Sequence, residues 1–397
     1  MKSRSIPYTV LLLLLCMNML FGCAEINDSP IEKSAAETST GTSAETVSDE
    51  KSEAVSEPEE ISEEVSSEES SEESCEESED ESMKMFDKDN IILKIGLMSD
   101  FHFDAINTYT ENYANNTDIV CTAVNFLKEK FGEDDLPAIV IGGDIDNWNG
   151  IADLQMAKAA FEKCLDPSKT ELIPTVGNHD DWCTNGKEPV DNELSGKKVF
   201  VDYNLFKEIL GSYVYHDTSL TPTEAMLTQG FYHTSINGIH FISVTGVDGD
   251  HGYQSLVNMT KELDKIRSSE DAGKPVFIIT HTPPRNTVVG TEYDEKVRWT
   301  SDTIAQKLEN YPEAVLLTGH THAKADTKDV LWQEDSFTVL HSGCIGEEDH
   351  SFASLEIDIN GCIRYTGYHV VRDRKAKTGW SVEAYPGCRF AFETKQK

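Results

Sequence analysis

Polar residues with metal-binding side chains follow five apolar runs, and this arrangement constrains the chain more than any other feature. The first run, Ile91–Met98, precedes Ser-Asp-Phe-His, and the second, residues 138–141, precedes Gly-Gly-Asp. The later runs precede Gly-Asn-His-Asp, a single His, and Gly-His-Thr-His. Short apolar runs next to glycines are typical of buried strands. Because α/β folds bind ligands at the carboxyl ends of strands, we predict a site where these five ends meet.

Helical and strand-like patterns alternate along the first part of the domain and then give way to strands. We predict helices over residues 119–131, 151–165, 256–267 and 302–308, and later short hairpin strands over residues 337–341, 354–359 and 363–371. An earlier hairpin is indicated by Asn237-Gly238, a dipeptide that favours the type I′ turn. This order predicts an α/β (α+β) domain of two packed mixed sheets with helices on the outside.

The charge of the chain is divided between two regions of different character. The whole sequence carries a formal net charge of -37, and residues 24–84, with 22 acidic and three basic side chains, contribute about half of it. That segment is almost entirely Ser, Glu, Thr and Ala, so we expect a disordered acidic linker. Residues 85–397 are then one domain, whose remaining acidity argues against a nucleic-acid partner.

Residues 1–23 have the pattern of an export signal. Lys2 and Arg4 precede an apolar stretch that is short for a membrane span, and the segment ends in Leu-Phe-Gly-Cys. That ending resembles a bacterial lipobox, which implies that Cys23 is lipidated and becomes the mature N-terminus. An ordinary cleaved signal peptide and a retained transmembrane anchor are the alternatives. All three versions predict a protein outside the cytoplasm, and the lipidated one predicts a protein anchored to the membrane through its lipid.

The strand-end motifs supply seven candidate metal ligands. They are Asp100, His102, Asp144, Asn178, His281, His320 and His322. One ion would leave several of them unused, whereas two divalent ions that share a carboxylate would use them all. Oxygen and imidazole ligands without a thiolate suit Mn, Fe, Zn or Ni.

The ordered set D-x-H, G-D, G-N-H-D, H and G-H-x-H resembles the calcineurin-like metallophosphoesterase superfamily. The resemblance runs from Asp100 to His322, and the layout is most similar to the bacterial cyclic-nucleotide-phosphodiesterase-like members. It implies a four-layer α/β/β/α sandwich and a dinuclear metal centre. In such a centre Asp144 would bridge, and a hydroxide between the metals would attack phosphorus.

The resemblance also implies how the ligands divide and which residue acts on the substrate. The first metal would take Asp100, His102, Asp144 and His322, and the second would be completed by Asn178, His281 and His320. His179 is the residue that in this family faces the scissile phosphate and protonates the leaving oxygen or stabilises the transition state.

One position departs from the pattern of the family. Many relatives carry an acidic residue three positions after the bridging Asp, where it helps to orient the catalytic histidine. This chain has Asn147 there. Asp180 or Asp146 are the alternatives for that orienting role.

Four further residues are candidates for substrate contacts. Trp148 and Trp182 follow ligand motifs and could stack on a ring, Arg285 could neutralise a phosphate, and His251 lies in a Gly/Asp segment after a strand. For each of them, ordinary packing or surface exposure is the alternative reading.

The sequence therefore predicts a membrane-tethered, extracytoplasmic phosphoesterase that hydrolyses a phosphodiester or a phosphomonoester. A small molecule or a cell-envelope phosphoester is the expected substrate. The alternative is a non-catalytic lipoprotein that binds a metal or ligand on a degenerate phosphoesterase scaffold.

Overall fold

The computed structural model describes most of the unit that spans Ser74–Lys397. The described residues are 80–105, 116–147, 150–181, 206, 209–214, 231–244, 250–292, 299–333, 336–347 and 349–394. The predictions for the leader, for Cys23 and for most of the acidic linker fall outside these ranges, as do Trp148 and Trp182. Among the helices in these ranges, none has both the length and the apolar character of a membrane span.

The first sheet has six strands in the order β12-β11-β10-β1-β2-β3. Its members are β1 (Ile91–Met98), β2 (Ala138–Ile141), β3 (Glu171–Pro174), β10 (Ser351–Asp358), β11 (Ile363–Arg372) and β12 (Trp380–Phe392). β1, β2 and β3 are parallel, and β10 joins β1 in the antiparallel direction. The three parallel strands therefore end at one edge of this sheet.

The second sheet also has six strands, in the order β4-β5-β6-β7-β9-β8. Its members are β4 (Tyr232–Ile236), β5 (Ile239–Ser243), β6 (Val276–Ile279), β7 (Ala314–Thr318), β8 (Leu331–Gln333) and β9 (Thr338–His341). β5, β6, β7 and β9 are parallel, whereas β4 and β8 pair in the antiparallel direction at the two edges.

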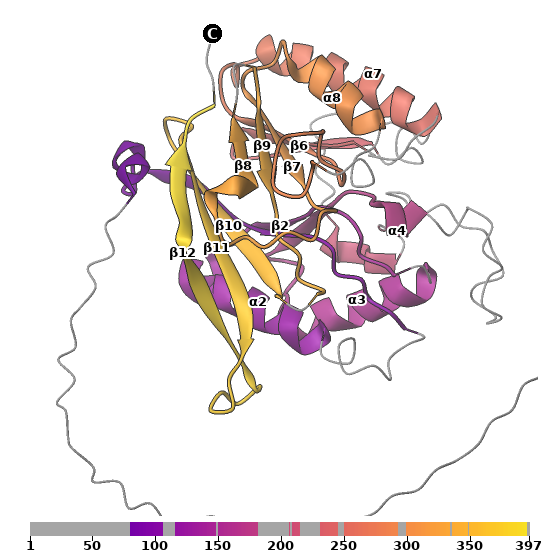
Figure 1. Cartoon of the computed structure of the whole chain (residues 1–397), viewed down its shortest axis with the longest axis vertical. Coiled ribbons are helices and arrows are strands. Elements are labelled where there is room, and N and C mark those ends of the chain that lie inside the picture. Colours follow the sequence, from indigo (N-terminus) through magenta and orange to yellow (C-terminus); the bar gives the residue numbers. More distant parts are fainter. Residues whose placement is uncertain are drawn as a thin grey trace, which may run out of the picture. The chain divides into compact units, whose positions relative to one another are not determined.

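The sheets pack on each other, and a pair of helices covers each outer face (Figure 1). α2 (Asn116–Phe131) and α3 (Ile151–Cys164) lie on the first sheet, and α7 (Asp250–Arg267) and α8 (Trp299–Leu308) lie on the second. Alternation along the strands produces the layers, because successive side chains point to opposite faces. This is the predicted four-layer α/β/β/α sandwich of two mixed sheets.

Strand β6 illustrates that alternation. Its residues Phe277 and Ile279 join the core shared with the first sheet, whereas Val276 and Ile278 join the core beneath α7 and α8. All four side chains are buried, so the strand reads as a continuous apolar run.

Short elements complete the domain. They are the 3-10 helices η1 (Glu81–Met85), η2 (Glu133–Asp135), η4 (Gly211–Tyr213) and η6 (Lys328–Val330), and the single-turn helix α4 (Asn178–Asp181). η1 crosses the predicted linker boundary at residue 84, because it begins at Glu81 and ends at Met85. Asp80 caps η1 and also pairs with Lys328, and Ser82 Oγ accepts a hydrogen bond from the Ala391 amide. These contacts tie the end of the acidic segment to the domain.

One predicted turn is confirmed, and one strand was not predicted. Asn237 and Gly238 have φ of 53° and 75°, as the predicted type I′ turn between β4 and β5 requires. Strand β12 was not predicted, because Pro386 and Gly387 interrupt its pattern. β12 lies at the edge of its sheet, where a proline is tolerated.

Candidate metal centre

The carboxyl ends of strands from both sheets converge on one group of side chains. Asp100 follows β1 and Asp144 follows β2 in the first sheet, while His281 follows β6 and His320 follows β7 in the second. The backbone amide of His320 donates to both carboxylate oxygens of Asp100, at 3.1 Å each. The two sheets are therefore joined directly at the site.

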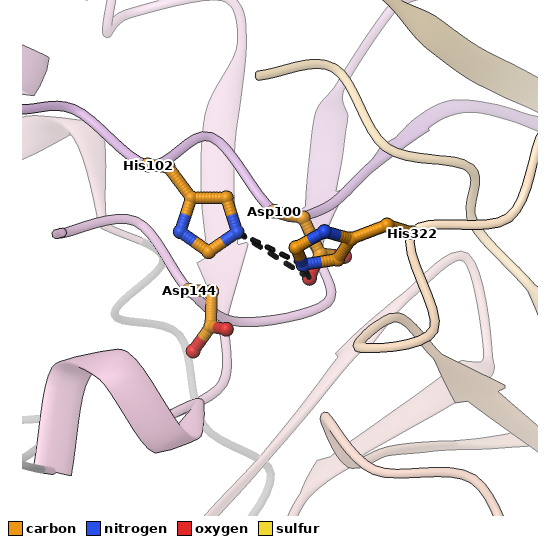
Figure 2. Close-up of side chains that lie close together, drawn as sticks. All are labelled: Asp100, His102, Asp144 and His322. Carbon is orange, nitrogen blue, oxygen red and sulfur yellow. Dashed lines mark hydrogen bonds and ion pairs between the residues drawn. The ribbon is translucent and has the colours of Figure 1, made fainter. Parts of the chain in front are cut away.

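Figure 2 shows the first cluster, in which His102 and Asp100 both approach the ring of His322 and Asp144 lies beside them. Each offers one ligand atom, and these atoms all lie within 4.8 Å of one another. His102 Nε2 is 3.1 Å from His322 Nε2, which in turn is 3.3 Å from Asp100 Oδ1. Both carboxylates are fully buried. Nitrogen and carboxylate atoms that converge at these distances are the donor set that a divalent transition metal takes.

A second cluster consists of Asp144, His281 and His320, and it shares Asp144 with the first. His281 Nε2 is 2.9 Å from Asp144 Oδ2 and 3.2 Å from His320 Nδ1. The other ring nitrogen, His281 Nδ1, is 2.8 Å from the carbonyl of Gly142, to which it donates. This hydrogen bond leaves Nε2 as the ligand atom, which is the usual way in which a metal-binding histidine is oriented.

Asn178, the seventh predicted ligand, is the first residue of α4. Its Oδ1 atom is buried and accepts no hydrogen bond from the residues that the structure describes. A buried amide oxygen without a donor is costly unless a cation or another donor reaches it. The donor types, the convergence and this oxygen all fit divalent metal ions.

The electrostatics of the site fit the same interpretation. Burial alone would raise the pKa of Asp100, but the nearby His281, His322 and His102 rings outweigh it and hold the pKa well below its usual range. The pKa of Asp144 is likewise lowered by His281, His102 and His179 against the effect of burial. Two buried carboxylates at one site require nearby positive charge, which protonated rings or bound cations can supply.

The backbone of the ligand loops is strained. Five predicted ligands have a left-handed φ, which non-glycine residues rarely adopt: Asp100 (54°), His102 (47°), Asp144 (50°), His320 (70°) and His322 (56°). Strain of this kind persists only where the surrounding structure enforces it, and it concentrates at functional sites. The left-handed conformation therefore lowers the stability of the fold, and it directs these side chains into the site.

Two glycines of the motifs are required by close approach of the ligands. A Cβ atom on Gly177 would lie 2.1 Å from Asp144 Oδ1, and one on Gly319 would lie 2.5 Å from Asp100 Oδ2. Any side chain at either position would displace a ligand. This explains why the motifs read Gly-Asn-His and Gly-His-x-His.

Asp180 has a different role from the one considered for it. Its carboxylate accepts four backbone N–H groups, from Asp144, Ile145, Asp146 and Gly177, at 2.8–3.0 Å. Asp180 therefore holds the loop after β2 in place, and these bonds occupy both of its oxygens. It supports the bridging ligand rather than the ring of His179.

His179 lies beside the first cluster. Its backbone N–H donates to Asp144 Oδ1 at 2.8 Å, and its ring packs edge-on against His102 with 4.5 Å between centroids. Nδ1 of His179 is 3.2 Å from Asn147 Oδ1. Burial lowers the pKa of His179 to about 4. Asn147 thus contacts the ring at the position where relatives have an acidic residue.

Sequence reasoning missed Glu347. Its Oε1 atom is 2.6 Å from Nδ1 of His322, the nitrogen that does not face the cluster. A carboxylate behind a ligating histidine fixes the ring and strengthens it as a ligand. The sequence offered only the position of Glu347 after the strand β9, a further parallel strand that ends at this edge, and that position does not identify its partner.

His341 is a buried histidine at the end of β9. Its Nε2 lies 3.0 Å from the carbonyl of Gly319 and 2.9 Å from Thr321 Oγ1, and its Nδ1 accepts the Gly343 amide. It therefore supports the loop that carries His320 and His322.

Among the predicted substrate residues, Arg285 does not join the clusters. Arg285 is exposed on the segment after β6, and its Nε is 3.8 Å from Asp302 Oδ2 in α8. His251 belongs to the first turn of α7, so the loop expected at that position is wrong. The side chain of His251 lies outside the described residues.

The sequence of this domain also matches a family model. The model of the calcineurin-like phosphoesterases matches residues 93–324, more than half of the chain and the part that holds every predicted ligand. The chain belongs to the calcineurin-like phosphoesterase family. This family uses divalent metal ions, and the two clusters form a plausible site for them. Membership supports, in general terms, a metal-dependent phosphoester hydrolase.

Solved structures that match this chain have distant sequences. A purple acid phosphatase from yellow lupin (Lupinus luteus) seeds is 12% identical with a TM-score of 0.44, over 74% of this chain and 53% of its own. The NAD nucleotidase of Haemophilus influenzae is 12% identical with a TM-score of 0.40, over 73% and 53%. A protein serine/threonine phosphatase from Saccharomyces cerevisiae is 12% identical with a TM-score of 0.30, over 77% and 81%.

The chain thus spans about half the length of the first two of these structures. A search of curated proteins found no match.

Proposed function

We propose that this calcineurin-like phosphoesterase hydrolyses a phosphodiester or a phosphomonoester with two divalent metal ions. The observation that carries the proposal is the pair of ligand clusters that share Asp144, with His179 packed against the first. A site that only stored a metal would need no second cluster and no histidine beside it.

The residues of the chain have distinct parts in this proposal. Asp100, His102 and His322 would hold one ion, His281, His320 and Asn178 would hold the other, and Asp144 would bind both. Bound ions of this kind, Mn, Fe, Zn or Ni, supply an activated water and neutralise phosphate oxygens. His179 would donate a proton to the leaving oxygen or stabilise charge that develops there.

The setting of the activity is a further part of the proposal. We place the enzyme outside the cytoplasm of a bacterium, anchored to the membrane through a lipid on Cys23 and separated from it by the acidic linker. Its substrate would be a small-molecule or cell-envelope phosphoester, and its place in the family would be near the cyclic-nucleotide-phosphodiesterase-like members. The acidic domain argues against a nucleic-acid substrate.

The activity is tested with the full chain, stripped of metal and reloaded with each candidate ion. Activity on bis-p-nitrophenyl phosphate and p-nitrophenyl phosphate separates diesterase from monoesterase action. We expect Asp144→Asn to lose at least a thousandfold in kcat/KM, because both clusters lose a ligand charge. Asp166→Asn, at an exposed position away from the site, is the control.

Two results would contradict the proposal. Tight metal binding without turnover of any phosphoester would favour the non-catalytic binding protein. Full activity in Asp144→Asn would show that Asp144 is not a ligand shared by the two ions. Lipidation is tested separately, by labelling cells with a fatty-acid probe. The label should be lost in Cys23→Ala, and its persistence there would disprove the anchor.

A further inference from the structure

We propose that Asp104 is a positioning residue, which acts through Asn147 to hold the ring of His179 with its proton on Nδ1. This inference rests on the proposed function, because it concerns the histidine that would act on the substrate. It assigns a role to a buried carboxylate that follows the D-x-H motif by two residues. It also accounts for an asparagine at the position where relatives have an acid.

The first step concerns the orientation of the Asn147 amide. Its Nδ2 donates to Asp104 Oδ2 at 3.1 Å. A carboxylate accepts hydrogen bonds, so it selects the NH₂ end of the amide and turns the carbonyl end, Oδ1, toward His179. The orientation of the asparagine is therefore set by Asp104.

The second step concerns the ring. Asn147 Oδ1 lies 3.2 Å from His179 Nδ1, and an amide oxygen can only accept. Nδ1 must therefore carry the hydrogen of this contact. In the neutral ring the second nitrogen, Nε2, then carries no proton, so it takes one up from water to form the imidazolium and passes that proton to the leaving oxygen.

The third step concerns the rigidity of the relay, by which we mean the contacts from Asp104 through Asn147 to His179. Asp153 accepts the backbone N–H of Asn147 through one oxygen at 2.9 Å, and that of Ala105 through the other at 2.7 Å. It thus ties the segment of Asn147 to the segment of Asp104. Asp104 and Asp153 are at most 2% exposed, so water does not compete with these bonds. A relay held in this way keeps its geometry when substrate binds.

The relay differs physically from a direct carboxylate. The carboxylate of Asp104 polarises the amide, which strengthens the carbonyl oxygen as an acceptor. The contact with the ring is nevertheless made by a neutral group. The chain therefore keeps the orientation that an acid would provide and places the negative charge one residue farther from the ring.

The first experiment measures the tautomer of His179 directly and needs no activity. ¹⁵N-histidine-labelled full-length protein without metal is studied by NMR, and His179→Gln identifies the signals of His179. We expect the proton on Nδ1 in the wild type and its redistribution toward Nε2 in Asp104→Ala. A wild-type ring with the proton on Nε2 would overturn the proposal, whether or not the protein proves to be a phosphoesterase.

The second experiment measures the leaving-group dependence of hydrolysis. A poor leaving group such as phenol needs the proton from His179, whereas p-nitrophenol hardly does. We expect Asp104→Ala to lower kcat about 100-fold with phenyl esters and less than 10-fold with p-nitrophenyl esters, within the range of general acid catalysis. Asp104→Asn, which keeps an acceptor oxygen, should retain most of the wild-type activity that Asp104→Ala loses.

The controls separate positioning from damage to the fold. Asn147→Leu removes the hydrogen bonds of Asn147 to Asp104 and to His179, so it should reproduce both effects. It provides the test if Asp104→Ala does not fold. Asp166→Ala, at an exposed position, should change neither readout. An equal loss with both leaving groups in Asp104→Ala and Asn147→Leu would mean a merely structural role and would overturn the proposal.

Discussion

Gly177 provides the sharpest test of how the bridging carboxylate is held. It is the glycine of the Gly-Asn-His-Asp motif, and a methyl group added in Gly177→Ala would meet three atoms of Asp144. The new Cβ would lie 2.1 Å from Oδ1, 2.4 Å from the backbone nitrogen and 2.8 Å from Cγ. The φ of Gly177 is not in the left-handed region, so the obstacle is contact and not backbone conformation.

The required displacement follows from these distances. An ordinary contact begins at 3.4 Å, so Oδ1 must move by about 1.3 Å and the backbone nitrogen by about 1.0 Å. The backbone cannot rotate away, because Asp180 holds the amides of Asp144, Ile145 and Asp146. A metal site tolerates errors of about 0.2 Å in ligand distance. The variant should therefore lose the bridge.

We expect two measurable effects of Gly177→Ala. The stability of the metal-free protein should fall by about 1–3 kcal/mol in chemical denaturation, the usual cost of overpacking. Metal affinity measured by calorimetry should fall at least 100-fold, and kcat/KM should fall with it, since a 1 Å misplacement costs about that factor.

The matched control for this variant is Gly387→Ala in β12. Its Cβ would meet only the carbonyl of Asp326 at 3.4 Å, which is an ordinary contact. This change should leave stability, metal affinity and activity near those of the wild type. Wild-type metal affinity in Gly177→Ala would refute the reasoning, because it would mean that Asp144 can move without consequence.

Three further predictions concern the support of the ligands and the ions. Glu347→Gln should weaken metal binding about 10–100-fold, because the charge behind His322 is lost; unchanged affinity in calorimetry would show that this exposed carboxylate does not tune the ligand. His341→Phe leaves the Gly319 carbonyl and the Gly343 amide without their buried partner, so the unfolding free energy should fall by about 2–6 kcal/mol; a loss below 1 kcal/mol in urea denaturation would contradict this. Removal of metal by a chelator should lower the unfolding free energy by about 2.7 kcal/mol from its value at 100 times the Kd, whereas Asp144→Asn should melt alike with and without the chelator.

The sequence by itself determined most of the strands and the candidate ligands. Runs such as Ile91–Met98 and residues 138–141 match β1 and β2 residue for residue, because a strand buried on both faces must be apolar throughout. The ligands could be identified since they follow strand ends at once, and parallel strands end at a common edge. Asp100 and Asp144 are the clearest examples.

Only the tertiary structure decided how the side chains around those ligands are connected. Asp100 meets the amide of His320 across 220 positions of sequence, and Asp104 reaches Asn147 across 43. Local pattern carries no information about such contacts, because they depend on where the two sheets and their loops pack. The assignment of Asp180 to the backbone, of Asn147 to His179 and of Glu347 to His322 followed from that packing alone.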